Sequence, residues 1–305
     1  MVLSEAVARA VSDGAPVVAL ESTIITHGLP RPENFQAALE FEQKVADGGA
    51  VPATIAVLEG VVHVGLEADE LRRLAGSEDV LKLSARDLPV AMAQGATGGT
   101  TVAATALLAS RAGIRVFATG GVGGVHRNAG ATFDESADLT ILGSCRMTVV
   151  SGGIKSILDI GATLERLETL SVTVVVFGTD RFPAFWLTDS GYKADFSVRS
   201  PEEVAEVMAR ADALDLPGGI LVANPLPEDA QLDPVLHERL LADALTAAEA
   251  ASVRGKEITP FVLDYIHEHT GRTSFAINLD IVRGNCALAA RIARAWSQLR
   301  TRDSP

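Results

Sequence analysis

The sequence predicts an α/β protein with a three-layer α/β/α architecture, in which helices cover a large, mostly parallel or mixed sheet. Short apolar runs rich in β-branched residues alternate with helical patterns along most of the chain, which is typical of a largely parallel sheet. From about Asp233 onward the pattern becomes almost purely helical, so we expect a helical C-terminal part. No repeat, low-complexity linker or clear boundary interrupts the sequence, and we therefore expect residues 1–305 to form one domain.

The apolar runs give the expected strands, in chain order Val17–Leu20, Ala53–Leu58, Val80–Leu83, Arg115–Ala118, Thr148–Val150, Thr173–Phe177 and Ile220–Ala223. Helical patterns are found at Ala103–Ala112 and at Thr273–Leu299. Residues 200–203 mark another helix start, because Ser200 is a suitable N-cap, a proline follows it and a capping-box glutamate comes next. Thr259 and the proline after it repeat this signal.

Length and composition indicate a folded globular protein, since 305 residues with 48% hydrophobic content supply a sizeable core. The formal net charge of −13 opposes binding to RNA, DNA or acidic membranes, because a basic surface is needed to neutralise phosphates. Any nucleotide ligand should therefore be a free monomer. Only Cys145 and Cys286 are present, and neither a secretory signal pattern nor a membrane-spanning apolar run occurs, so we expect a cytoplasmic protein.

Glu21 directly follows the expected strand Val17–Leu20. Ligands of open α/β sheets bind beyond the carboxyl ends of the strands, which makes this carboxylate a candidate acid or base. The alternative is a carboxylate that only accepts hydrogen bonds from amides of its own loop. His27, in the turn that follows, is more typical of an ordinary polar loop residue.

Lys155 follows an apolar run and two glycines, in what we interpret as the first turn of a helix. The partial positive charge of a helix N-terminus would disfavour an ammonium and lower its pKa, and a neutral lysine is a nucleophile of the Schiff-base type. A solvated surface lysine is the alternative. The segment is not a P-loop, because Ile154 replaces the glycine before the lysine and the upstream glycine spacing is absent.

Two further segments are rich in glycine. Residues 94–102 lead into the expected helix Ala103–Ala112, where free backbone amides would suit a phosphate group; an ordinary loop is the alternative. Residues 119–127 do not form a dinucleotide-binding motif, because His126 stands where the last glycine belongs.

Three carboxylates, those of Asp134, Glu135 and Asp138, lie within five residues. Asp134 and Asp138 would be one turn apart if the segment were helical, and could then face one site. Oxygen ligands favour a hard cation such as Mg²⁺ or Mn²⁺. Acidic residues that merely cap a helix are the alternative interpretation.

Several long segments carry a family resemblance: Ala19–Thr23 with Thr26–Gly28, Pro52–Ala56, Gly98–Thr105, Phe117–Gly121 with Gly123–Arg127, Phe133–Asp134 with Ser136–Asp138, Lys155–Asp159, Gly178–Asp180 and Phe182–Phe185. Together they resemble the pseudouridine-5′-phosphate glycosidase family, which is related to the indigoidine-biosynthesis A proteins. The resemblance spans nearly the whole chain.

The resemblance implies reversible cleavage of the carbon–carbon glycosidic bond of pseudouridine 5′-phosphate, which gives uracil and ribose 5-phosphate. It implies Lys155 as the nucleophile that forms a covalent ribose adduct, Glu21 as the proton donor, and Asp134 as the ligand of a divalent cation, Mn²⁺ or Mg²⁺. The family also suggests a homotrimer. The substrate contacts that it implies are Lys82, Val102, Ser136, Ala137 and Asp138, and Thr119, His126 and Asn278 are further candidates because they lie in or near family-like segments.

Two other classes of function stay open at this point. A sugar-phosphate binding protein could use the same glycine-rich loop and metal without a nucleophilic lysine. A metal-dependent aldolase or lyase for another sugar phosphate would keep Lys155 and Asp134 and differ in the residues that contact the base.

Overall fold

The computed structural model describes residues 1–254 and 257–303. Its strands are β1 (Val2–Leu3), β2 (Val17–Leu20), β3 (Val51–Leu58), β4 (Val61–Val64), β5 (Leu81–Leu83), β6 (Gly98–Thr100), β7 (Val116–Ala118), β8 (Thr148–Ser151), β9 (Thr173–Phe177), β10 (Ser197–Val198) and β11 (Ile220–Ala223). Its α-helices are α1 (Glu5–Ser12), α2 (Glu33–Asp47), α3 (Ala68–Gly76), α4 (Leu88–Ala93), α5 (Val102–Arg111), α6 (Ala129–Thr132), α7 (Ala137–Leu142), α8 (Ile160–Thr169), α9 (Pro201–Ala213), α10 (Pro234–Ala250), α11 (Ile258–His269) and α12 (Thr273–Asp303). Short helical turns lie at η1 (Ile24–Gly28), η2 (Ala85–Asp87) and η3 (Glu228–Ala230).

The strands form one mixed sheet in the order β1-β4-β3-β2-β7-β8-β11-β9-β10, and β6 joins β5 to β3. All neighbouring strands from β3 to β10 in this order are parallel, whereas β4 and β6 run antiparallel to β3. In this register Leu20 lies beside Ala118, and Ala118 lies beside Val150. The residues that follow β2, β7 and β8 therefore leave the sheet at one common edge.

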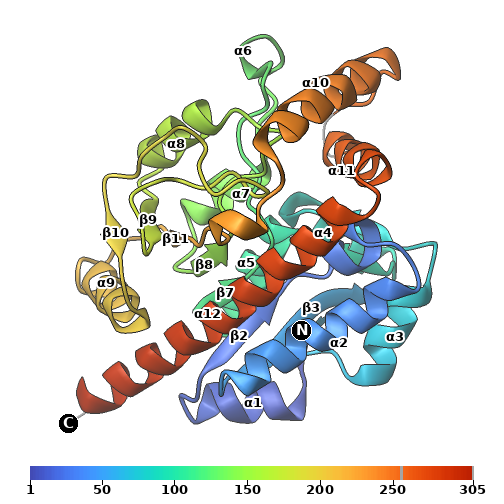
Figure 1. Ribbon diagram of the computed structural model, residues 1–305. Coiled ribbons are helices and arrows are strands. Elements are labelled where there is room, and N and C mark those ends of the chain that lie inside the picture. Colours follow the sequence, from blue (N-terminus) through green and yellow to red (C-terminus); the bar gives the residue numbers. More distant parts are fainter. Residues whose placement is uncertain (255–256, 304–305) are drawn as a thin grey trace.

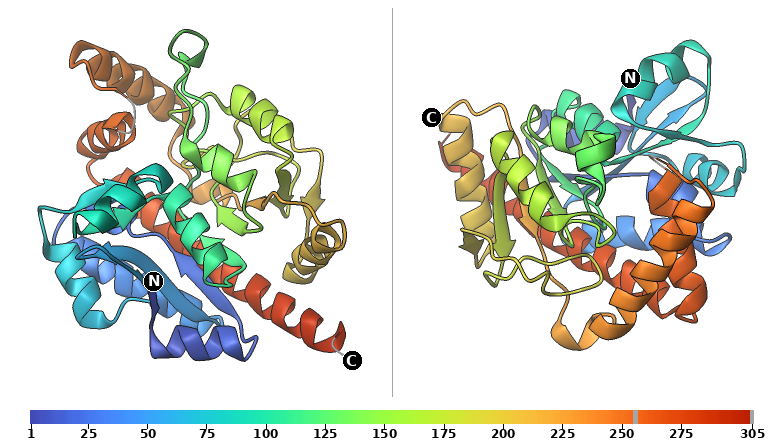
Figure 2. Two further views of the ribbon diagram at one scale, coloured as in Figure 1. Left: turned by 180° about the vertical axis from the view of Figure 1, so that it is seen from behind. Right: turned by 90° about the horizontal axis from the view of Figure 1, so that it is seen from above.

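Helices cover both faces of this sheet, as predicted. Figure 1 shows α12 crossing the face that also carries α2, and the view from behind shows α1 and α5 on the opposite face (Figure 2). The two faces have separate apolar cores, one with residues of α2, α9 and α12 and one with residues of α1, α5, α7 and α8. The three-layer α/β/α prediction is confirmed.

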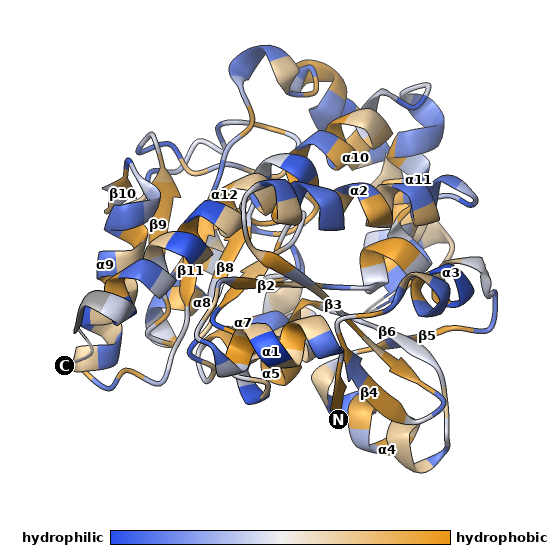
Figure 3. Cartoon of the chain, turned by 90° about the horizontal axis from the view of Figure 1, so that it is seen from below, coloured by the Kyte–Doolittle hydropathy of each residue, from blue (hydrophilic) through white to orange (hydrophobic). Residues whose placement is uncertain are grey.

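The sheet is apolar on both sides, which explains why its strands have continuous hydrophobic sequences rather than alternating ones. Val18 and Leu20 of β2 pack in the core with α2 and α12, whereas Val17 and Ala19 pack in the other core. Successive side chains of a strand point to opposite faces, so each layer receives every second residue. Figure 3 shows these hydrophobic strands between helices that carry hydrophilic residues on their outer turns.

All the expected strands are present, with ends displaced by at most two residues. The helix start at Ser200 is confirmed, since its hydroxyl accepts the amide hydrogen of Glu203 at 3.2 Å, but the Glu203 carboxylate accepts from the amide of Arg199 rather than of Ser200. Thr259 does not cap α11, because this helix begins at Ile258.

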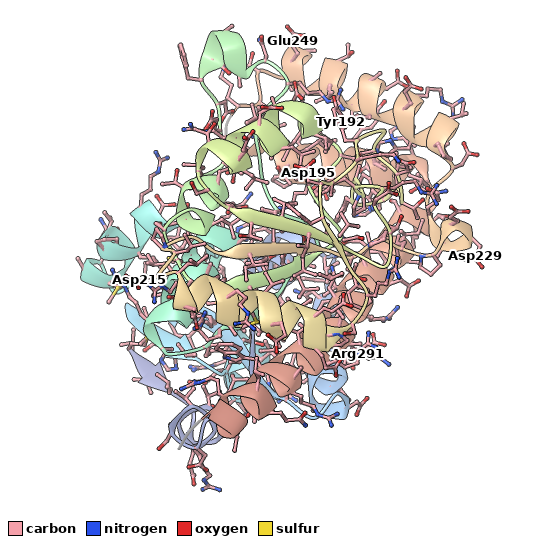
Figure 4. The ribbon with its side chains drawn as sticks, turned by 90° about the vertical axis from the view of Figure 1, so that its left-hand side faces the viewer. Tyr192, Asp195, Asp215, Asp229, Glu249 and Arg291 are labelled. Carbon is pink, nitrogen blue, oxygen red and sulfur yellow. The ribbon has the colours of Figure 1, made fainter. Side chains whose placement is uncertain are left out.

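Charged side chains populate the outer surface. Figure 4 labels Asp195, Asp215, Asp229, Glu249 and Arg291, all of which are exposed on loops or on the outer sides of helices. Among the described helices, none is both long and apolar enough to cross a lipid bilayer. Cys145 and Cys286 are buried free thiols.

Candidate functional site

A cavity of about 630 Å³ lies at the carboxyl edge of the sheet. Its walls come from Glu21 and η1, the end of β5 with η2, the start of α5, residues 120–126 and 134–138, and the segment around Lys155. Residues of α11 and the loop before it, together with Asn278 of α12, complete the walls. The common edge of β2, β7 and β8 therefore opens into one cavity that is lined by side chains distant in sequence.

Glu21 lines this cavity, and its carboxylate accepts a hydrogen bond at Oε1 from the hydroxyl of Thr119. Burial raises the pKa of Glu21 above its ordinary value, and the positive charge of Lys155 and the Thr119 hydrogen bond partly oppose this. A carboxyl with a raised pKa can keep its proton at higher pH and deliver it as a general acid. Glu21 is therefore more than a loop carboxylate that binds its own amides.

Lys155 also lines the cavity, but the helix expected around it is not there. Helix α8 begins at Ile160 with Asp159 as its N-cap, and Lys155 lies in the turn that precedes it. The helix-dipole argument for a neutral amine is therefore wrong for this residue. The backbone amide of Lys155 instead donates to the carbonyl of Val122 at 3.1 Å, which fixes the lysine against residues 120–125.

The aliphatic part of Lys155 passes close to a glycine. A methyl group added at Gly121 would lie 3.2 Å from Cγ of Lys155 and 2.8 Å from Cδ2 of Phe185. Only glycine permits this approach. The glycine-rich segment after β7 therefore leaves space for the side chain of Lys155, and it is not a dinucleotide-binding segment.

Asp134 and Asp138 both line the cavity, but not from a single helix. The segment is broken, because α6 ends at Thr132, Phe133 adopts a left-handed conformation and α7 begins only at Ala137. Asp138 is buried, and its two carboxylate oxygens accept the amides of Ala103 at 2.9 Å and Gly123 at 2.8 Å. Its carboxylate therefore joins α5 to the glycine-rich segment.

Residues 135–137 lie on the cavity wall beside it. Glu135 forms an ion pair with Arg166 at 2.9 Å, which removes it from the expected cluster of three carboxylates. Ser136 is the N-cap of α7, and its hydroxyl accepts from the amide of Asp138 at 3.2 Å. Ala137, the first residue of α7, and Val102, the first residue of α5, also line the cavity. Two helix N-termini thus border the same space, where the Asp138 carboxylate already binds the Ala103 amide of α5 and Val102 and Ala137 stand at the first helical positions.

The metal ligand that the resemblance implies, Asp134, lines the cavity with 30% of its side chain exposed. Its Oδ2 lies 4.0 Å from Nδ1 of His126, and burial lowers the pKa of this imidazole. No set of three or more His, Cys, Asp or Glu side chains among the described residues is arranged to enclose a metal ion. The donor set fits a hard cation that keeps most of its water ligands and takes one carboxylate, and does not fit a closed zinc site.

The other predicted contacts divide into two groups. Lys82 of β5, His126 and Asn278 line the cavity, and the amide oxygen of the buried Asn278 has no hydrogen-bond partner in the described part of the protein. Thr119 is almost fully buried and is not among the residues that line the cavity; its hydroxyl donates to the carboxylate of Glu21.

Some residues of the cavity wall carry no sequence signal for a site. His27, which the sequence marks as an ordinary polar turn residue, lines the wall from η1, and Arg86 lies just beyond β5. Phe185 ends one of the family-like segments and could have been found there. Arg254 and Leu263 come from the C-terminal helical part, where no local sequence motif indicates a site.

Comparisons with known proteins show the family to which the chain belongs. The family model described as "Indigoidine synthase A like protein" matches residues 6–295. The chain belongs to this family. A "Pseudouridine-5'-phosphate glycosidase" of Frankia alni is 57% identical over 297 residues, which cover 97% of this chain and 82% of that protein. One from Saccharopolyspora erythraea is 55% identical, with 97% and 98% coverage.

Two solved structures share the fold of this indigoidine synthase A-like protein. The prealnumycin C-glycosynthase AlnA in complex with ribulose 5-phosphate superposes with a TM-score of 0.91 at 34% identity, covering 99% of this chain and 98% of that one. An indigoidine synthase A-like protein from Thermotoga maritima gives a TM-score of 0.86 at 36% identity, with 93% and 94% coverage. The family resemblance and the fold class are thereby confirmed.

Proposed function

We propose that this protein is a pseudouridine-5′-phosphate glycosidase, which cleaves pseudouridine 5′-phosphate reversibly to uracil and ribose 5-phosphate. The observation that carries this proposal is the pairing of a carboxyl whose pKa is raised, Glu21, with Lys155 in one cavity. Relatives that are 57% and 55% identical over nearly the whole chain carry this name, and AlnA forms a complex with a pentulose phosphate.

The carbon–carbon bond of a C-nucleotide sets the chemical problem. Protonating a glycosidic oxygen, the usual route of glycosidases, is impossible because that bond contains no oxygen. The electrons of the broken bond must be accepted by the base, and C1′ of the sugar needs a partner that can donate electrons as the bond breaks. A lysine amine bound to C1′ meets this need.

In the proposed reaction Nζ of the neutral Lys155 amine forms a bond to C1′ while the C1′–O4′ bond breaks, and O4′ takes the proton that the new secondary ammonium loses, which leaves a secondary amine with a lone pair. The bond between C1′ and C5 of uracil then breaks as the nitrogen lone pair forms a C1′=N iminium. C5 receives the proton that Glu21 supplies, and uracil leaves. Water adds to the iminium and releases ribose 5-phosphate and the free amine.

The remaining residues would position the substrate. We assign the phosphate to the first turns of α5 and α7, with Val102 and Ala137 acting through their backbone amides, Ser136 through its hydroxyl and Lys82 on the same cavity wall. The structural role of Asp138 is to hold these two helix starts against the glycine-rich segment. We assign the uracil ring to the part of the wall that Asn278 lines, because the side-chain amide of Asn278 can bind a base and its oxygen has no partner among the described residues.

A divalent cation, Mn²⁺ or Mg²⁺, belongs to the proposal. Asp134 would hold it, and the ion would supply positive charge near the sugar phosphate. The cytoplasmic location and homotrimeric assembly that the family resemblance implies are part of the same proposal. Light scattering of the purified protein measures the assembly.

The experiment that tests the function is incubation of the protein with pseudouridine 5′-phosphate and Mn²⁺, followed by mass spectrometry of the products. Uracil and ribose 5-phosphate should appear together in equal amounts. Uridine 5′-monophosphate is the matched control, since it differs in having a carbon–nitrogen glycosidic bond. Binding of pseudouridine 5′-phosphate without turnover would favour the sugar-phosphate binding protein, and a different product would favour a lyase for another sugar phosphate.

A further inference from the structure

His237 connects α10 to the turn that carries Lys155, although it does not line the cavity. Its Nε2 lies 2.8 Å from Oγ of Ser156, the residue that follows Lys155. Both side chains are 4% exposed, so this hydrogen bond is shielded from water. A buried hydrogen bond of this kind is costly to break by removing one partner, because the other is left unsatisfied.

The turn is held from two other directions. On one side the amide of Lys155 donates to Val122, and the amide of Leu158 donates to the carbonyl of Lys155 at 3.0 Å. On another side the guanidinium of Arg127 donates to the carbonyls of Ser156 at 3.1 Å and Ile157 at 3.3 Å. These contacts fix the backbone. His237 is the partner of the Ser156 side chain, and it approaches from the C-terminal helical part.

His237 is itself well fixed. Its ring meets that of Trp186 edge-on, with centroids 5.9 Å apart, and Trp186 in turn packs beside Phe185 of the cavity wall. Burial lowers the pKa of His237 to about 4, and the positive charge of Arg127 acts in the same direction. The imidazole is therefore neutral near pH 7, with one nitrogen that donates and one that accepts.

We infer that His237 is a positioning residue for the reaction, which holds the turn after Lys155 through Ser156 and thereby fixes the amine relative to the sugar. The inference rests on the proposed function, in which Lys155 must reach C1′ of the substrate. Displacement of a reacting group by about 1 Å can reduce the rate on the order of 100-fold, so a fixed turn has a direct kinetic effect.

Three variants separate the hydrogen bond from packing. His237→Phe keeps a ring against Trp186 and removes the hydrogen bond, Ser156→Ala removes the other partner, and His237→Gln places an amide nitrogen close to the position of Nε2. We expect kcat on pseudouridine 5′-phosphate to fall about 10- to 100-fold in the first two, with KM changed less than about threefold. His237→Gln should have most of the parent kcat. The double variant that combines His237→Phe with Ser156→Ala should be no slower than the slower of these two single variants, because both remove the same hydrogen bond.

The neighbouring exposed residue of α10 provides the control, since Glu238→Gln leaves the Ser156 contact intact and should keep the parent kcat. Thermal unfolding of each variant shows whether it is folded at the assay temperature. If His237→Phe is unfolded there, Ser156→Ala and His237→Gln decide the question.

The inference is overturned if Ser156→Ala keeps the parent kcat, or if folded His237→Gln is as slow as folded His237→Phe. The parent protein is assayed first. Absence of uracil release by the parent would refute the proposed function itself, whereas an active parent with unaffected variants would refute only the role of His237.

Discussion

The hydroxyl of Thr119 donates a hydrogen bond to Oε1 of Glu21, and this contact joins the residues that directly follow β7 and β2. Because the two strands are parallel neighbours, their register brings the pair together although 98 residues separate them in sequence. The bond stabilises the ionised form of a carboxyl whose pKa burial raises. Thr119 therefore adjusts the protonation of the proposed general acid.

Replacing this hydroxyl should change the pH profile of the reaction. Removal of a hydrogen bond to the carboxylate raises the pKa of Glu21 further, so Thr119→Val should extend the protonated, active form to higher pH. We expect the high-pH limb of kcat/KM to move upward by about 0.5–1 unit, the equivalent of one hydrogen bond. Thr119→Ser, which keeps the hydroxyl, should retain the parent limb. A downward shift in Thr119→Val would show that Glu21 does not act as the acid.

Asp138 should matter mainly for stability. Asp138→Asn leaves one of the two backbone amides, of Ala103 or Gly123, facing an NH₂ group, and loss of a buried hydrogen bond of this kind costs about 1–3 kcal/mol in the free energy of unfolding. Urea denaturation measures it. Asp134→Asn provides the control and should stay within about 0.5 kcal/mol of the parent, because this side chain is partly exposed. Equal effects of the two substitutions would contradict the assigned roles.

Asp134 should matter mainly for the metal. Exhaustive chelation should abolish activity and Mn²⁺ or Mg²⁺ should restore it, with Zn²⁺ inferior because the site offers a single carboxylate and water. Calorimetric titration of Mn²⁺ into the metal-free protein should show binding that Asp134→Ala weakens at least about 10-fold while its thermal unfolding stays unchanged. Full activity after chelation, or equal Mn²⁺ affinity in the variant, would remove Asp134 from the metal site.

The two helix starts that face the cavity predict dependence on the substrate phosphate. Pseudouridine without its phosphate should be a much poorer substrate, by about 100-fold or more in kcat/KM, because phosphate binding helps to orient the sugar. Pseudouridine within RNA should not react at all, given the formal net charge of −13. Rates measured with nucleotide, nucleoside and modified RNA check this. Comparable rates on nucleotide and nucleoside would argue against a phosphate site at α5 and α7.

The sequence was sufficient where a local pattern determines the structure. Continuous apolar runs located the strands, and placement directly after a strand marked Glu21 as a candidate, because parallel strands present their carboxyl ends at one edge. The sequence misled where tertiary contacts override the local pattern. The sequence around Lys155 predicts a helix start. The amide of Lys155 instead donates to the carbonyl of Val122, and α8 begins only at Ile160.

The role of Asp138 and the connection through His237 lay beyond sequence reasoning for a related reason. Asp138 binds the amides of residues 35 and 15 positions away, and His237 meets a serine 81 positions away. No local spacing records such contacts. The left-handed conformation of Phe133 likewise breaks the helix on which Asp134 and Asp138 were expected to share a face.

The proposed mechanism depends on a covalent bond between Lys155 and the sugar. It is tested by incubating the protein with ribose 5-phosphate, reducing with borohydride and locating the added mass by peptide mass spectrometry. The adduct should lie on Lys155, should be absent in a folded Lys155→Ala protein that has lost turnover, and should still form slowly in Glu21→Ala, because the amine rather than the carboxylate makes the bond. Labelling of another residue, or undiminished turnover of pseudouridine 5′-phosphate by Lys155→Ala, would contradict the proposed mechanism.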